Sequence, residues 1–284
     1  MNPSAGTPDQ LALAYKNACM AELQALKPGN VHVFADGHGM TIYDFMKSAD
    51  ASANLIAKPD LTIGERILGA VEATQQAVGM NTNLGLVLLC APLIHAALHR
   101  TEAQTFRQSL NDGLMQLTVD DAVLAGQAIV LASPAGLGNA DVNDVNQKPY
   151  VTLLTMMQSA QAKDRIAWQY ANDFSDVIDF GITRYSEAMD KWKNQAWATA
   201  ALYLGFLARQ LDTHVIRKYG ELLATEVMVE AQELEANYWL ADNPKLMQKN
   251  LLAWDVSLKN RNINPGTSAD LTVATLLAVY CVNY

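Results

Sequence analysis

The sequence contains only three cysteines, at Cys19, Cys90 and Cys281, and it has no Cys-x-x-Cys pair. An odd number of widely separated cysteines argues against a disulfide framework and indicates a reducing compartment. All three stand in apolar, helix-like surroundings, which favour buried thiols that pack as small hydrophobic side chains. We therefore expect a cytoplasmic protein whose fold depends on its hydrophobic core.

Basic residues are also scarce relative to acidic ones, and the formal net charge is −9. No basic cluster offsets this acidity, so we expect no nucleic acid partner. The longest apolar run, 84–98, contains Pro92 and His95 and is shorter than the roughly 20 residues of a bilayer span. The N-terminus has no basic region before an apolar core, so no signal peptide is predicted. A phosphorylated small ligand and a homo-oligomer both remain open.

Alternating strand patterns, internal repeats, low-complexity tracts and obvious linkers are absent as well. Helical periodicity is present instead, and Leu11, Ala14 and Ala18 form one apolar stripe in the first periodic segment. We predict an all-α protein, with one globular domain over residues 1–284 and about ten or more helices. The longest segment without periodicity, 133–149, is rich in Gly, Asn and Pro, and we expect it to be functional or mobile.

Polar residues gather in the loops, and the first such loop is Lys-Pro-Gly-Asn at 27–30. Its tight turn exposes N–H groups beside the Lys27 ammonium and can bind a phosphate. The same turn also suits an ordinary interhelix connection with a solvated lysine. His32 and His38 follow in a Gly-rich loop with Asp36. They would suit a metal site, but their spacing matches no compact zinc pattern, and loop histidines without a function fit equally well.

The segment Gly-Met-Asn-Thr-Asn-Leu-Gly at 79–85 joins two apolar, helix-like runs. Asn81, Thr82 and Asn83 place amide and hydroxyl groups at a predicted helix N-terminus. The N–H groups and the helix dipole at such a terminus favour an anion. Simple N-capping requires one residue of this kind, whereas three stand in a row here.

Several carboxylates are explained by capping boxes, in which an acid follows a Thr by three residues. This pattern occurs at Thr41–Asp44, Thr62–Glu65, Thr118–Asp121 and Thr267–Asp270. Asp173, Asp176 and Asp179 form a different pattern, because a spacing of three places them near one another on one helix face. Like charges at that distance require a cation, a basic partner or water.

The segment Leu-Asp-Thr-His-Val-Ile-Arg-Lys-Tyr-Gly at 211–220 follows an apolar helix and concentrates charge. Asp212, His214 and Lys218 lie within about one and a half helical turns of one another. An acid, an imidazole and cations at the mouth of a buried helix suit phosphate binding or acid–base catalysis. An ordinary charged helix start explains the same residues.

The last loop, Arg-Asn-Ile-Asn-Pro-Gly-Thr-Ser-Ala-Asp at 261–270, precedes a closing apolar helix. Asn-Pro-Gly is a turn signal. The residues Asn264, Ser268 and Asp270 stand around this turn. They form either the cap of the closing helix or part of a site, and the local sequence leaves both interpretations open.

The chain resembles the triphosphoribosyl-dephospho-CoA synthase family in five segments that occur in the family's order and approximate spacing. Within residues 26–277 they are KPGNV, GHGM, GMNTNLGLVLL, DTHVIRKYG and RNINPGTSADL. The resemblance implies an all-α fold, in agreement with the periodicity. It also implies a reaction in which ATP loses adenine and its triphosphoribosyl group moves to the ribose 2′-hydroxyl of 3′-dephospho-CoA.

The resemblance further implies partners and site residues. Positive charge develops at the anomeric carbon, which carboxylates stabilise, while Mg²⁺ and cations screen the triphosphate. The expected catalytic residues are His38, Asp212 and Asp270. The expected nucleotide-binding residues are Lys27, Gly29, Asn30, Asn81, Thr82, Asn83, His214, Lys218, Asn264, Gly266 and Ser268.

Three departures from the family pattern affect this expectation. The family commonly has an acid where His32 stands, another acid where Gly39 stands, and His-Lys where this chain has Asn-Leu at 83–84. Losing two acids and one cation would change the substrate or the metal arrangement. Asp173, Asp176 or Asp36 are the acids expected to replace them, and Asp173 and Asp176 are the residues expected to bind Mg²⁺.

These departures make the chain more similar to a divergent branch of the family found in methanogens and methylotrophs. There the genes accompany tetrahydromethanopterin- and methanofuran-linked one-carbon metabolism. Two alternatives to the family reaction therefore stay open. One is a phosphotransferase or ligase in the synthesis of a pterin or furan cofactor, and the other is a nucleotide-binding protein without catalysis.

Overall fold

The computed structural model describes residues 6–132 and 149–283, so nearly all of the segment 133–149, predicted to be functional or mobile, lies outside the described residues. Helices joined by loops make up both described ranges, where no strand forms and only two isolated bridges occur, both between residues 32 and 40. The all-α prediction is confirmed.

The helices are α1 (Pro8–Gln24), α2 (Ile42–Ile56), α3 (Ile63–Val78), α4 (Leu84–His99), α5 (Phe106–Met115), α6 (Val119–Ala132), α7 (Leu153–Ala160), α8 (Arg165–Ala171), the π-helix η1 (Asp176–Gly181), α9 (Ile182–Trp192), α10 (Gln195–Arg209), α11 (Thr213–Tyr219), α12 (Glu221–Leu240), the 3₁₀ helix η2 (Pro244–Met247), α13 (Gln248–Asn260) and α14 (Gly266–Asn283).

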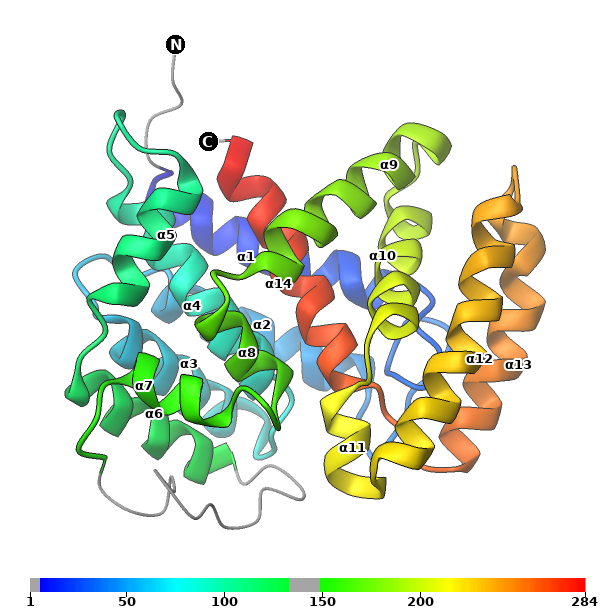
Figure 1. Cartoon of the computed structure of the whole chain (residues 1–284), viewed down its shortest axis with the longest axis horizontal. Coiled ribbons are helices and arrows are strands. Elements are labelled where there is room, and N and C mark those ends of the chain that lie inside the picture. Colours follow the sequence, from blue (N-terminus) through cyan, green and yellow to red (C-terminus); the bar gives the residue numbers. More distant parts are fainter. Residues whose placement is uncertain (1–5, 133–148, 284) are drawn as a thin grey trace.

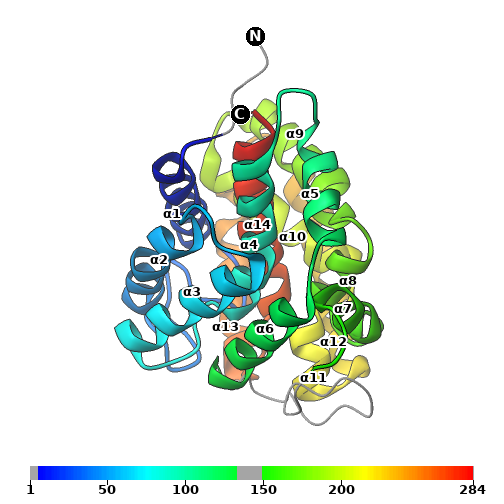
Figure 2. The same ribbon diagram turned by 90° about the vertical axis from the view of Figure 1, so that its left-hand side faces the viewer.

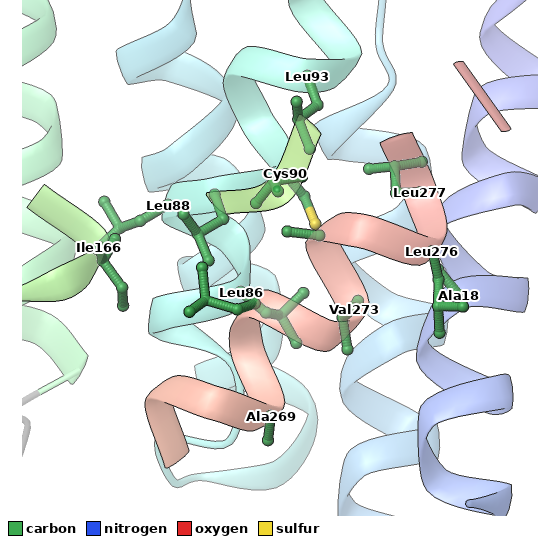
Figure 3. Packing of buried hydrophobic residues seen from close by; sticks show 14 of the residues in the cluster. Ala18, Leu86, Leu88, Cys90, Leu93, Ile166, Ala269, Val273, Leu276 and Leu277 are labelled. Atoms are coloured by element: carbon green, nitrogen blue, oxygen red, sulfur yellow. The ribbon is translucent and has the colours of Figure 1, made fainter. Parts of the chain in front are cut away.

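Helix α14 lies at the centre of the molecule and packs against α1, α4 and α10 (Figure 1). It is apolar around most of its circumference, as expected for a helix that is enclosed on all sides. Figure 3 shows Val273 and Leu277 of α14 among Cys90 and Leu93 of α4 and Ala18 of α1, all of them buried. Each large apolar side chain buried here stabilises the fold by roughly 1.5–3 kcal/mol. The three cysteines are buried free thiols, as predicted.

The remaining helices cover two sides of this centre. Helices α2, α3 and α6 pack in sequence on one side (Figure 2), and α9 and α12 pack on α10 on the other. Helix α13 lies beside α12 at the end of the molecule (Figure 1), where the Trp254 indole donates to Glu230 Oε2 at 2.6 Å. Across the two described ranges no single helix is long and apolar enough to cross a membrane. Helices α5 and α6 together are long and apolar enough, but they are bent by 93° relative to each other.

Capping boxes set several helix starts. Reciprocal Thr–acid hydrogen bonds form at Thr41–Asp44, Thr62–Glu65 and Thr118–Asp121, as predicted. The fourth predicted box, Thr267–Asp270, was wrong. Thr267 lies inside α14, and its hydroxyl contacts the Thr213 hydroxyl at 3.1 Å and accepts from the backbone N–H of His214.

The segment that carries Asp173, Asp176 and Asp179 is not one continuous α-helix. Asp173 has a φ of 51°, and a π-helix then precedes α9. This geometry separates the three acids of the segment. Asp176 forms a bidentate ion pair with Arg165, and Asp179 forms one with Arg107. The prediction that these acids share one helix face was therefore wrong, because the backbone between them is not α-helical.

Candidate active site

Residues of the five sequence segments come together where the loop 25–41 lies against the starts of α11 and α14 (Figure 1). Asn30 Nδ2 donates to Asn264 Oδ1 at 2.8 Å, which joins the first segment to the last. The backbone N–H of Ser268 donates to Asp212 Oδ2 at 2.8 Å, which joins the fourth segment to the last. Residues more than two hundred positions apart in the sequence thus form one polar region within an apolar helical fold.

Lys27 is buried in this region. Its ammonium donates to a carboxylate oxygen of Glu22, to Val31 O at 2.8 Å and to Asn30 Oδ1 at 3.2 Å. Burial lowers the pKa of Lys27 and raises the pKa of Glu22, and the attraction between the two charges opposes both shifts. The alternative of a solvated lysine was wrong, since the Lys27 side chain is fully buried in an ion pair.

The turn at Gly29 is fixed by its neighbours. Gly29 has a φ of 84°, and a Cβ there would lie 2.8 Å from Pro265 Cδ, so only glycine fits. Asp255 of α13 holds the loop, because its Oδ1 accepts from the Gly29 N–H at 2.8 Å and lies 3.3 Å from His32 Nε2. Its Oδ2 accepts from Lys259 Nζ at 3.0 Å. His32, which stands where the family commonly has an acid, therefore pairs with an acid from a distant helix.

His38 lies at the edge of the same loop. Its Nε2 is 2.8 Å from Gly29 O, and burial lowers its pKa, with a further contribution from the nearby Lys218 charge. Asp36 is exposed and accepts from a backbone N–H of α2. Among the described residues no three His, Cys, Asp or Glu side chains are placed to hold a metal ion. A metal site at His32, His38 and Asp36 has no support, and the catalytic role of His38 stays a prediction.

The polar residues before α4 make hydrogen bonds within the protein. Asn81 Oδ1 accepts from the N–H three residues on at 3.1 Å, and the Thr82 hydroxyl contacts the Ser48 hydroxyl of α2. Asn83 Nδ2 donates to Thr74 Oγ1 of α3 at 2.8 Å. Capping and interhelix contacts account for all three side chains, so their role in nucleotide binding stays a prediction.

Asp212 joins the starts of two helices. Its Oδ1 accepts from the N–H groups of His214 at 3.0 Å and Val215 at 3.2 Å, which caps α11. Its Oδ2 accepts from the N–H and hydroxyl of Ser268 in α14, at 2.8 and 2.9 Å. Burial raises the pKa of Asp212, and these four donors oppose the shift. Because both oxygens are engaged, the geometry favours a positioning role over the catalytic role predicted from the sequence.

His214 is held against the start of α14. A Cβ on Gly266 would lie 2.5 Å from His214 Nδ1, so this close approach requires glycine. Burial, with the charges of Arg217, Lys218 and His38, lowers the pKa of His214 to about 4, so the imidazole is neutral at pH 7. Its Nε2 is buried and has no hydrogen-bond partner in the described part of the chain. A neutral, unpartnered ring nitrogen is suited to bind a polar ligand group.

Asp270 is only half-buried and forms no hydrogen bond with the described residues. Its carboxylate lies against α4, and a Cβ on Gly85 would be 2.0 Å from Asp270 Oδ2. Burial raises the pKa of Asp270 well above its usual value. Neighbouring acids raise it further and one cation opposes them; these groups are Asp212, Glu22, Asp164 and Arg217. Asp270 thus lies inside α14 and does not form the predicted capping box, and its role as a site acid stays a prediction.

The start of α8 supplies two further groups. Asp164 caps α8, and its Oδ2 accepts from Arg217 Nη1 at 3.1 Å. Arg165 follows it and is held by Asp176 through two hydrogen bonds of 2.7 and 2.9 Å. Asp176 is buried and already neutralised by this guanidinium. Both oxygens of Asp176 are thus engaged, which does not favour its predicted Mg²⁺ role, and the Mg²⁺ role of Asp173 stays a prediction.

A pocket with about 270 Å³ of empty space, part of it open to solvent, lies beside these groups between α1, α2, α4 and α14. Its polar lining comes from Tyr15, Glu22, Ser48 and Asn83. Leu86 and Val273 also line it, and they neighbour Gly85 and Asp270 in their helices. Glu22 therefore lines the pocket directly, and Asp270 stands three residues before the lining Val273 in α14.

Sequence reasoning missed several residues of this region. Glu22 left a signal, because it follows Ala18 by four positions and so lies on the buried stripe of α1. An acid on an apolar stripe is a candidate for a site or for a buried ion pair. Asp255 left no such signal, since it meets Gly29 across 226 residues of sequence. Asp164 left no such signal either, since only packing brings it to Arg217.

Comparisons with known proteins agree on the fold and identify a family. The family model for ATP:dephospho-CoA triphosphoribosyl transferase matches residues 8–284. The fold is similar to that of an Archaeoglobus fulgidus protein provisionally named triphosphoribosyl-dephospho-CoA synthase, with a TM-score of 0.63 and 22% identity over 82% of this chain and 97% of that one. No curated protein matched the chain.

Proposed function

This chain belongs to the ATP:dephospho-CoA triphosphoribosyl transferase family, and from that premise we propose that it displaces adenine from ATP with an acceptor hydroxyl. The bond between C1′ of the ribose and N9 of adenine breaks, and a bond from C1′ to the acceptor oxygen forms. The triphosphate stays on the transferred ribose. The acceptor that we propose is the 2′-hydroxyl of 3′-dephospho-CoA, as the family description suggests.

The observation that carries this proposal is the convergence of the family's segments around Asp270. Loop 27–30, the start of α4, and the starts of α11 and α14 meet there, beside a pocket lined by Glu22. Substitution at an anomeric carbon passes through an oxocarbenium-like state, and acidic groups stabilise its positive charge. Glu22, Asp164 and Asp212 bring carboxyl groups to this region, where Lys27 pairs with Glu22 and Arg217 pairs with Asp164.

Cations for the triphosphate come from α11 in this proposal. Lys218 is exposed, and the Arg217 side chain is 25% exposed beside Asp164. Both flank the neutral imidazole of His214. Lys27 differs, because its ammonium protons go to acceptors of the protein. We propose that Lys27 balances the charge of Glu22 and does not contact a phosphate.

Mg²⁺ commonly binds to one or two carboxylates together with substrate phosphates. The described residues offer no group of three acidic or imidazole ligands for such an ion, and Asp176 is already paired with Arg165. A Mg²⁺ ion that screens the triphosphate would therefore be held by one or two carboxylates together with the phosphates.

The experiment that tests the proposal is incubation of the purified protein with ATP, Mg²⁺ and 3′-dephospho-CoA. We expect adenine in the chromatogram and a matching gain of mass on dephospho-CoA. Release of ADP or phosphate without adenine would replace the proposal with a phosphotransferase or ligase. Thermal stabilisation by ATP without turnover of any acceptor would indicate a nucleotide-binding protein.

A further inference from the structure

Two carboxyl groups of this region, those of Glu22 and Asp270, have different surroundings. The Glu22 carboxylate faces the Lys27 ammonium and lines the pocket. The Asp270 carboxyl group has no hydrogen-bond donor among the described residues and lies against Gly85, and burial and the charges of nearby acids raise its pKa. Both groups act electrostatically on Lys27, and Glu22 acts on Asp270, so the two belong to one site. In several enzyme classes, such a difference in surroundings makes one carboxyl group the general acid and leaves the other ionised.

The surroundings of Glu22 stabilise its ionised form. Lys27 donates directly to its carboxylate, and Asn30 and Val31 hold the ammonium in place from the other side. Burial nevertheless raises the pKa of Glu22, which makes the carboxylate a better proton acceptor than an exposed glutamate. An ionised carboxylate with raised basicity at a pocket wall is suited to act as a general base.

The surroundings of Asp270 stabilise its protonated form. Burial and the nearby acids raise its pKa, and Arg217 gives only partial compensation. The titratable groups that act on it from the packed elements are Cys19 and Glu22 of α1, Lys27 of the following loop, Cys90 of α4, Asp164 of α8, and Asp212 and Arg217 at α11. Among these the cysteines are neutral, because burial raises their pKa values as well.

We propose that Asp270 donates a proton to the departing adenine and that Glu22 accepts the proton of the attacking hydroxyl. This inference rests on the proposed function and assigns the acid and the base within it. Glu22 becomes a catalytic residue, and Lys27 becomes the group that positions and ionises it. Asp212 keeps its positioning role at the starts of α11 and α14.

The step balances without a further reactant. The acceptor oxygen forms a bond to C1′ while the bond from C1′ to N9 breaks with its electron pair on adenine. The proton of Asp270 neutralises the adenine anion, and the hydroxyl proton passes to Glu22. Asp270 is then ionised and Glu22 is protonated, and proton exchange with solvent restores both groups. No oxidant, reductant or metal takes part in these transfers.

The pH profile is the first test, with Asp270→Asn, Glu22→Gln and the exposed control Asp190→Asn. For the wild type we expect kcat/KM to fall on the alkaline side as Asp270 ionises and on the acidic side as Glu22 is protonated. Asp270→Asn should lose roughly 10²–10⁴-fold in kcat and also lose the alkaline limb. Glu22→Gln should lose a similar factor and the acidic limb. Asp190→Asn should match the wild type.

A leaving group that needs no protonation is the second test. Adenine methylated at N7 departs as a neutral base, so ATP carrying it does not require a general acid. We expect this analogue to restore Asp270→Asn to within about tenfold of the wild type, as the contribution of a general acid predicts. Glu22→Gln should stay slow with the same analogue. Equal impairment of Asp270→Asn with both nucleotides would overturn the assignment.

Infrared spectroscopy tests the protonation of Asp270 without an activity assay. A carboxylic-acid C=O band should be present at neutral pH in the wild type and in Glu22→Gln, and absent in Asp270→Asn. A band that persists in Asp270→Asn would contradict the proposal. Glu22→Gln leaves Lys27 without its partner and could fail to fold for that reason. In that case the double variant Glu22→Gln/Lys27→Met, which removes both buried charges, takes its place in the tests.

The two proposals fail in distinguishable ways. A wild-type protein that releases no adenine would remove the proposed function and the two proton transfers with it, whatever the infrared band shows. A wild-type protein that releases adenine, combined with an ionised Asp270 or an unrescued Asp270→Asn, would retain the transferase and remove only this assignment.

Discussion

At the scale of single residues, the position of Asp270 depends on glycine at position 85. Gly85 stands in the first turn of α4, and a Cβ there would lie 2.0 Å from Asp270 Oδ2 and 2.8 Å from Ile166 Cδ1. Real atoms do not approach so closely. Glycine costs about 1 kcal/mol relative to alanine within a helix. The absence of a side chain at Gly85 therefore makes room for the carboxyl group.

Gly85→Ala should therefore inactivate the enzyme without unfolding it. The new methyl group displaces the Asp270 carboxyl, while the better helix propensity of alanine offsets part of the strain. We expect kcat for adenine release to fall at least tenfold, because a small misplacement of a catalytic group costs that much or more. Single-turnover kinetics and the midpoint of thermal unfolding measure the two effects separately.

Gly69→Ala is the matched control. Gly69 also lies in a helix, and no atom stands within 4 Å of a Cβ placed there. It should keep wild-type kinetics and gain about 0.5–1 kcal/mol in the free energy of unfolding. If both variants behave alike, the contact between Gly85 and Asp270 has no bearing on activity.

At the scale of elements, one carboxylate joins two helices. Asp212 caps α11 with one oxygen and binds Ser268 at the start of α14 with the other. Asp212 thereby fixes the position of the central helix α14 relative to α11, the short charged helix that carries His214 and Lys218. An N-cap of the usual kind satisfies donors of a single helix.

Asp212→Ala should cost more stability than the loss of an ordinary cap. It leaves two N–H groups of α11 and the N–H of Ser268 without an acceptor, and the free energy of unfolding should fall by about 2–4 kcal/mol. Thr7→Ala removes the exposed cap of α1 and should cost about 1 kcal/mol. Urea unfolding measures both. Equal losses would show that the link to α14 contributes nothing to stability.

At the scale of the whole molecule, acids buried in the site couple stability to pH. Burial raises the pKa of Asp270 in the folded state above the unfolded value near 3.9. The folded protein therefore holds this proton to higher pH than the unfolded chain does. The stability contributed by protonated Asp270 is fully present below the unfolded pKa and is lost as pH rises through the folded pKa.

Asp270→Asn should accordingly make stability less dependent on pH on the alkaline side. An amide has no proton to lose, so between about pH 5 and pH 8 the free energy of unfolding should fall less in the variant than in the wild type. The thermal midpoint at neutral pH should stay within a few degrees of the wild type or rise above it. Urea unfolding at both ends of this range measures the difference. A parallel fall in both proteins would show that Asp270 is already ionised.

The helices of this protein could be predicted from short stretches of sequence. Apolar side chains recur with helical spacing along α1, and Thr–acid pairs mark the starts of α2, α3 and α6, because both signals act within a few residues. The prediction failed at Asp173, where a positive φ and a π-helix interrupt the helix and Asp176 pairs with Arg165 of another element. It also failed at Thr267, whose hydroxyl bonds to α11 instead of capping α14.

The sequence by itself determined the all-α class, the buried thiols and the polar segments that resemble the family. These follow from composition, local periodicity and residue order, which are properties of short stretches of chain. Tertiary structure alone decided which acids face a cation and which face other acids. Lys27 donates to Glu22, Asp212 accepts four hydrogen bonds, and no described residue donates to the Asp270 carboxyl group. The physical reason is that charge interactions depend on distance and burial, which the packing of helices far apart in sequence sets.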